Sequence, residues 1–184
     1  MTLFLISGPA EEPVTLAEVR AHLRLDGTGE DALLTAFITA ARAVLEGETR
    51  RAFVTQSWRL LLDEWPGAAV RLPLAPSAAV TAVMIDGVGA LDPAFYQTAL
   101  AGDEPRIVAA GTWPAPLRRV AGIAIDFTAG YGDAAAVPAP LKQAVLMLVA
   151  HWFEHREPVS FGDAPAEMPL AVSALVAPYR RMRL

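Results

Sequence analysis

The chain has 184 residues, no cysteine, and a net charge of −5 at pH 7 from 15 basic and 20 acidic side chains. The absence of cysteine excludes disulfides, iron–sulfur clusters and cysteine-ligated zinc, and a chain of this length can build one sizeable core without such links. The acidic balance gives no general attraction to nucleic acid or to an anionic membrane.

Two helices are predicted in the first 50 residues. The opening stretch MTLFLISGPAEEP has no basic residue and only a short apolar run, unlike a signal peptide. Thr15 and Glu18 match a capping box at the start of a short amphipathic helix. The turn DGTGE separates it from a second helix at residues 31–50, whose apolar stripe is Leu34, Phe37, Ile38, Ala41 and Leu45. The pair predicts an α-hairpin.

Residues 53–132 have the composition of short strands. The stretches SWRLLLDEW, AVRLPLAP, VTAVMIDGVG and IAIDFTAGYG are rich in β-branched and aromatic residues and are separated by glycine and proline. Residues 85–88, Ile-Asp-Gly-Val, predict a hairpin turn. Seven prolines between Pro66 and Pro116 argue against long central strands, so we expect a small antiparallel sandwich or barrel.

Helix is predicted again at the C-terminal end. Pro138 and Pro140 suit the first turn of a helix, and LKQAVLMLVAHWFEHRE continues without a breaker to Pro158. A last helix, PLAVSALVAPYR, is expected to stop near Pro178. The longest apolar helical run, residues 144–153, is far shorter than the roughly 20 residues that span a bilayer, so we expect a soluble protein with no membrane partner.

The order of helices, strands and helices predicts an α+β fold. We expect a helical bundle formed by the N-terminal α-hairpin (residues 1–52) and the C-terminal helices and tail (residues 133–184). A small antiparallel β-sandwich or barrel (residues 53–132) is then an insertion between the two halves of the bundle.

The stretch HWFEH places His151 and His155 on one face of a helix, with Glu154 beside them, as in one class of zinc hydrolases. Catalytic zinc needs a third protein ligand, and the carboxylates that follow lie in or beside a proline-rich loop: Glu157, Asp163 and Glu167. The alternative is structural. Because residues 141–153 are apolar on nearly every side, His151 is then a buried or interfacial histidine, and His155 a surface residue at the helix C-terminus. We favour the structural interpretation.

Other catalytic patterns are missing from the sequence. Its serines Ser57, Ser77, Ser160 and Ser173 stand outside a G-x-S-x-G elbow. GDEPRIVAAG and AGYG lack the spacing and the lysine of a phosphate loop. We interpret His22 as an exposed polar residue, and Asp126 and Asp133 as solvated carboxylates. We therefore predict no catalytic residue and no cofactor.

A resemblance to a known family is carried by four stretches: PVTLAEVRAHLRLD, EDALLTAFITAARAVLEGETRRAFVTQSWRL, FTAGYGDAAAVPAPLKQAVLMLVAHWFEHRE and LAVSALVAPYR. Together they resemble the head–tail connector, or adaptor, proteins of long-tailed phages and phage-derived gene transfer agents. The likeness covers nearly the whole chain and is weakest at residues 66–119. Its most specific parts are the first two helices followed by TQSW, and the stretch from AGYG through PLK to HWF. In this family the position of His155 is variable and polar, so the second zinc ligand looks accidental.

The resemblance implies a structural protein rather than an enzyme. Such proteins form a ring, usually twelve-fold, beneath the portal in the neck of the particle, and a stopper or tail-terminator protein binds below. DNA passes through the channel, and we expect acidic or neutral walls that do not hold it specifically. Assembly is expected in the bacterial cytoplasm.

The resemblance also implies two kinds of contact residue. Each ring subunit must contact its neighbours through two surfaces, and a helix that is apolar on all sides and a mean hydropathy of +0.36 fit this requirement. The resemblance therefore implies that Met147, His151 and Trp152 are interface candidates. The tail APYRRMRL carries the candidates for docking on the portal, Tyr179, Arg180, Arg181 and Arg183. A frayed, solvated end is the alternative for this tail.

Two other functions stay open at this point. One is the zinc-dependent hydrolase based on HWFEH. The other is a β module that binds a carbohydrate or protein ligand through exposed aromatic residues, with Trp58, Trp65, Tyr96 and Trp113 as the candidates.

Overall fold

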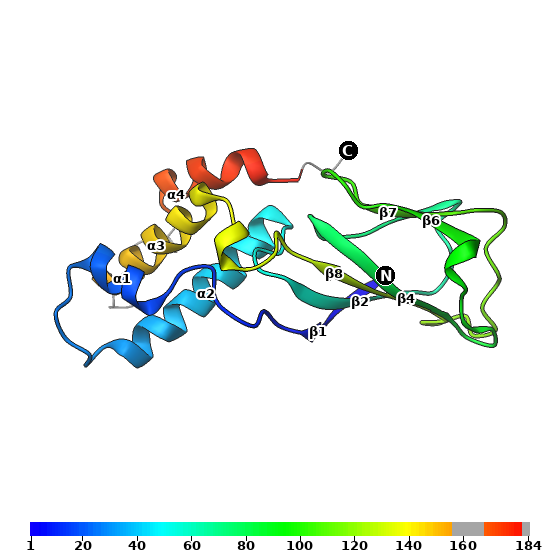
Figure 1. Ribbon diagram of the computed structural model, residues 1–184, viewed down its shortest axis with the longest axis horizontal. Coiled ribbons are helices and arrows are strands. Elements are labelled where there is room, and N and C mark those ends of the chain that lie inside the picture. The colour runs from blue at the N-terminus through cyan, green and yellow to red at the C-terminus, as the bar shows by residue number, and fades with distance from the viewer. Residues whose placement is uncertain (156–167, 182–184) are drawn as a thin grey trace, which may run out of the picture. The chain divides into compact units, whose positions relative to one another are not determined.

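The computed structural model describes residues 1–155 and 168–181, and it confirms the α+β class (Figure 1). These residues hold helices and two antiparallel sheets, and they divide into two compact units. The β unit comprises Met1–Ala10 and Arg50–Tyr131. The helical unit comprises Glu11–Thr49 and the residues from Gly132 onward. The three-part division at residues 52/53 and 132/133 stays a prediction, although the first strand falls within residues 1–52.

The larger sheet of the β unit has five strands in the order β1-β2-β8-β4-β5, and every neighbouring pair is antiparallel. Its strands are β1 (Thr2–Ser7), β2 (Gln56–Leu62), β8 (Ile123–Ala129), β4 (Ser77–Ile85) and β5 (Gly89–Ala90). The predicted hairpin turn joins β4 to β5, where the Val88 N–H donates to the Ile85 carbonyl at 3.0 Å.

The smaller sheet has the order β3-β7-β6 and is also antiparallel. Its strands are β3 (Ala69–Arg71), β7 (Arg106–Ala109) and β6 (Tyr96–Ala99), and the 3-10 helix η1 (Pro93–Phe95) leads into β6. The sequence stretches quoted above overlap β2, β3, β4, β5 and β8, whereas β1, β6 and β7 were not predicted.

The prolines delimit the strands instead of shortening them. No proline lies inside a strand of the described structure, and Pro76 and Pro105 come directly before β4 and β7. The expectation that central strands would be short is therefore wrong for β4, which runs for nine residues.

Both sheets contribute side chains to one hydrophobic core. Strand β8 alternates strictly between buried and half-buried residues, as expected for a strand with one face on a core. The core cluster includes Leu60 and Leu62 of β2, Val83 and Ile85 of β4, Ile123, Ile125 and Phe127 of β8, Val70 of β3 and Ile107 of β7.

The helical unit contains α1 (Leu16–Leu23), α2 (Asp31–Thr49), α3 (Ala139–Glu154) and α4 (Leu170–Val176), as the apolar periodicity predicted. Two 3-10 turns, η2 (Ala134–Ala136) and η3 (Ala177–Tyr179), precede α3 and follow α4. Helix α3 contacts α1, α2 and α4. No helix in the described ranges is long and apolar enough to cross a membrane.

The predicted capping box starts α1. The Glu18 N–H donates to the Thr15 hydroxyl at 3.2 Å, and the Thr15 N–H donates to the Glu18 carboxylate at 2.6 Å. The Thr15 hydroxyl also donates to this carboxylate, at 2.8 Å, and the bonds from the backbone N–H and then the hydroxyl of Thr15 lower the pKa of Glu18. His22 is exposed on the same helix, as predicted.

Candidate assembly surfaces

The two histidines of HWFEH lie on the last turn of α3, with ring centroids 4.5 Å apart. His155 caps the helix: its backbone N–H donates to the His151 carbonyl at 3.1 Å, and its ring Nδ1 lies 2.9 Å from the same oxygen. Across residues 1–155 and 168–181, no three histidine or acidic side chains come together in a way that could hold a metal ion. The candidate third ligands, Glu157, Asp163 and Glu167, lie outside the described residues. The described geometry therefore assigns His155 to the end of α3.

Helix α3 has one fully buried side and one half-buried side. The buried residues are Leu141, Ala144, Val145, Leu148 and Val149. Met147 and His151 lie one turn apart on the half-buried side. Trp152 is also half-buried, but it packs edge-on against Phe37 of α2, with ring centroids 5.9 Å apart and planes at 66°. The structure thus brings Met147 and His151 together and gives Trp152 a partner within its own unit.

The described part of the C-terminal tail is fixed to the end of α2. The Arg180 guanidinium lies 2.7 Å from the Glu48 carboxylate and donates to the Ser173 hydroxyl at 2.9 Å. The Arg181 N–H donates to the Thr49 carbonyl at 3.4 Å. Arg180 is exposed, Tyr179 and Arg181 are half-buried, and Arg183 lies outside the described residues.

The aromatic residues of the β unit pack on its core. Trp58, Trp65, Tyr96 and Trp113 are all half-buried against the core cluster. Trp65 and Trp113 stack on each other, with ring centroids 4.1 Å apart and planes at 9°. Their indole N–H groups donate to the carbonyls of Pro114 and Ala68. Each ring of the stacked pair therefore has one face covered by the other.

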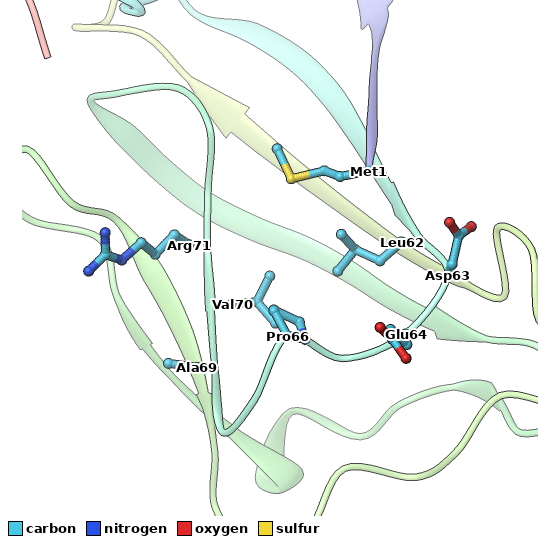
Figure 2. Close-up of a pocket in the computed structure, with 8 residues that line it drawn as sticks. All are labelled: Met1, Leu62, Asp63, Glu64, Pro66, Ala69, Val70 and Arg71. Atoms are coloured by element: carbon cyan, nitrogen blue, oxygen red, sulfur yellow. The ribbon is translucent and has the colours of Figure 1, made fainter. Parts of the chain in front are cut away.

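A pocket of about 530 Å³ lies between the end of β2 and β3, as Figure 2 shows. It is lined by Met1, Leu62, Asp63, Glu64, Pro66, Ala69, Val70 and Arg71. The lining combines apolar side chains with two carboxylates and one guanidinium, but no histidine, serine or threonine.

Two stretches that carried the family resemblance meet in the β unit. Gln56, in TQSW, pairs with Ala129, the first residue of AGYG. Gly130 has a φ of +138°, and a Cβ at this position would lie 2.6 Å from backbone atoms of Thr55. Glycine is required here both by backbone conformation and by the close approach of a second chain segment.

The most exposed apolar strand was missed by the sequence analysis. β1 is an edge strand of the larger sheet: β2 pairs with one of its sides, and no described strand pairs with the other. The exposed fractions of Phe4, Leu5 and Ile6 are 49%, 51% and 53%. The signal for this strand was present: the run LFLI ends at Gly8 and Pro9, a pattern typical of a short strand.

A second exposed apolar feature is the loop before β8. The Asp86 carbonyl accepts the Leu117 N–H, the Asp86 carboxylate accepts the Arg118 N–H, and the Asp63 carboxylate accepts the Ala121 N–H, at 2.8 to 3.1 Å. Within this fixed loop Leu117 is 80% exposed. No local sequence pattern indicated this loop, because its anchors, Asp63 and Asp86, are distant along the chain.

Comparisons with known proteins identify the family. The family model for head completion protein matches residues 12–182. A search of curated proteins found no significant match. Among solved structures, a chain in the neck of an empty gene transfer agent (GTA) particle, computed with C6 symmetry, is 35% identical, with a TM-score of 0.83 and coverage of 100% of this chain and 97% of that one.

Two further structures match over the same shares of both chains, each at 34% identity. One is the virion of a native GTA particle, with a TM-score of 0.81, and the other is the neck of a native GTA particle computed with C12 symmetry, with a TM-score of 0.79. These matches confirm the resemblance seen in the sequence. The chain belongs to the head completion protein family and has the structural role of a head–tail connector.

Proposed function

We propose that the chain forms a closed ring of twelve copies in the neck of a gene transfer agent or tailed-phage particle. The observation that carries this proposal is the match over the full chain to a subunit of a GTA neck computed with C12 symmetry. Below the portal protein, the ring extends the DNA channel and offers a surface to the stopper or tail-terminator protein. The copies assemble onto the particle in the bacterial cytoplasm.

The proposed role is structural and needs no catalytic group. The chain is acidic overall, with a net charge of −5. Tight DNA binding depends on clusters of Lys and Arg that displace counterions from phosphates. A ring with few such clusters lets DNA pass without holding it, so a DNA-binding assay at physiological salt is expected to show no retention by the assembled ring.

Two sets of side chains are proposed to make the contacts. Met147 and His151 on the half-buried side of α3, together with Trp152 at its end, form part of the contact between neighbouring copies. The tail residues Tyr179, Arg180, Arg181 and Arg183 dock on the portal. The ion pair of Arg180 with Glu48 is exposed, and such pairs are worth only about 0–1 kcal/mol, so a carboxylate of the portal can replace Glu48 at small cost.

Native mass spectrometry of the purified chain, alone and mixed with its portal, tests the ring. We expect a closed oligomer of about a dozen copies, alone or on the portal. Failure of the chain to form a ring alone and to bind the portal would contradict the connector assembly proposed here.

A charge-matched pair of variants tests the tail. Changing Arg180 and Arg181 to Gln is expected to weaken portal binding, whereas changing Arg71 and Arg106, which face each other across β3 and β7, is not. Both variants remove two positive charges. Equal binding by the two variants would exclude docking through these arginines.

A further inference from the structure

We infer that β1 of each copy lies against the open edge of β4 of the next copy, so that the larger sheet continues from subunit to subunit around the ring. This inference rests on the proposed ring and adds the surfaces by which two copies meet. It is based on two strand edges of the β unit that lack partners within the described chain.

The first edge is β1, which lacks the charges and prolines that protect an exposed strand and has only a register shift between Leu5 and Ser7. Its sequence, TLFLIS, contains no charge and no proline, and it pairs with β2 alone. Successive side chains of a strand point to opposite faces, so the half exposure of Phe4 and Leu5 leaves apolar surface open on both faces, although Leu3 packs against the core cluster. An apolar strand left open in this way is a pairing site for another chain.

The second edge is β4. β5 pairs with its last two residues, Met84 and Ile85, and the Leu91 N–H donates to the Val83 carbonyl at 2.8 Å. In the described chain this side of β4 is therefore open from Ala78 to Ala82. The open part carries small exposed residues, Ala78, Ala79 and Thr81. The strand bulges twice, and Ala78 and Thr81 stand outside the register with β8. Small side chains along this edge leave room for the larger Phe4, Leu5 and Ile6 of another copy.

The two edges lie at the same level of the sheet. Phe4 pairs with Arg59, Arg59 with Asp126, and Asp126 with Ala82. The middle of β1 is therefore level with the open part of β4, with β2 and β8 between them. Figure 1 shows these four strands together. Each neighbouring pair is antiparallel, so β1 and β4 run in opposite directions.

Ring symmetry favours a second copy as the occupant. A cyclic ring joins two different surfaces of the same chain, head to tail. Neighbouring copies in a twelve-fold ring differ by a small rotation, which preserves strand direction and brings β1 of one copy antiparallel to β4 of the next. A portal or stopper protein bound to β1 would leave the matching edge of β4 open.

Cysteine cross-linking tests this contact, because the chain has no cysteine of its own. The variant Ile6→Cys/Ala79→Cys replaces the wild-type chain in particle-producing cells, and purified particles are treated with a short bismaleimide. Within one copy, three strand spacings of about 4.8 Å separate β1 from β4, so the shortest reagents favour links between copies. The expected product is a ladder of covalent multimers. A matched control, Ile6→Cys/Val88→Cys, places the second thiol at the exposed β4–β5 turn and is expected to give mainly monomer.

The outcomes separate this inference from the proposed function. Particles that contain the chain but yield only monomers would overturn the β1–β4 contact and leave the connector role intact. Wild-type particles without the chain would instead contradict the connector role itself. As a second readout, Leu5→Lys is expected to leave the thermal unfolding midpoint of the monomer nearly unchanged while reducing ring formation at least tenfold. Normal rings from this variant would also overturn the contact.

Discussion

In the helical unit, residues three positions apart fix the start of α1, whereas in the β unit residues about 70 positions apart meet across the larger sheet. Thr15 and Glu18 bond to each other within one helical turn. By contrast, Arg59 of β2 and Asp126 of β8 form a bidentate ion pair across neighbouring strands, with N to O distances of 2.6 and 2.7 Å. The hydrogen bonds to Asp126, and then its charge, raise the pKa of Arg59.

This difference separates local from distant determinants of the fold. Helix ends depend on short sequence patterns that a single substitution removes at modest cost. The β unit depends on packing and close approach between distant segments, so a substitution at a contact of that kind affects the whole unit. Three substitutions test this contrast, in order of decreasing effect.

The largest loss of stability is expected for Phe127→Ala in β8. Phe127 is 1% exposed and belongs to the core that both sheets share. Removing a buried phenylalanine side chain typically costs about 3–5 kcal/mol. Phe4→Ala in β1 of the same sheet is the control, and a change of only about 0.5 kcal/mol is expected there. Urea denaturation of the two variants measures both values, and equal losses would mean that β1 is not exposed in solution.

Gly130→Ala is expected to cost about 1–3 kcal/mol or more. Its positive φ is strained for alanine, and the new Cβ would collide with the backbone of Thr55. Gly47 in α2 is the matched control, because a Cβ there meets no atom within 4 Å. Gly47→Ala is expected to stabilise the chain by roughly 0.5–1 kcal/mol. Losses of similar size at both positions, measured by thermal unfolding, would argue against the close approach at Gly130.

The smallest effect is expected for Thr15→Ala, which removes the capping box at a cost of about 1 kcal/mol at neutral pH. Because the folded chain lowers the pKa of Glu18, the contribution of its carboxylate is complete above the pKa of the unfolded state and is lost as the pH falls through the lower folded value. The difference between wild type and Thr15→Ala should therefore shrink in acid. A difference that grows between pH 7 and pH 3 would contradict this assignment.

The helices could be predicted because their signals are local. The apolar stripe of α2 and the capping box of α1 each lie within a few turns of helix, and both are found in the structure. The hairpin turn at Gly87 was predicted for the same reason. The family could also be identified, because TQSW and AGYG are short stretches that the fold brings together at β2 and β8.

The remaining strands depend on partners that the local sequence does not reveal. β1 pairs with a strand that begins about 50 residues later, and on its own it appears as a short apolar run. β6 and β7 have four residues each and pair with other short strands. The contact of Arg180 with Glu48 joins residues 132 positions apart. The local sequence of the basic tail therefore could not predict that its first arginine has an acidic partner within the chain.

The stacked indoles of Trp65 and Trp113 give the β unit its own optical signature. The electronic transitions of two indoles 4.1 Å apart couple, and a skew between their transition dipoles within the stacked planes produces a paired positive and negative band in the circular dichroism spectrum. Trp152, in the helical unit, has a phenylalanine as its ring partner and does not share that coupling. The coupled band therefore monitors melting of the β unit, while helical ellipticity monitors the other unit. Comparing the two in one experiment shows whether the units melt together.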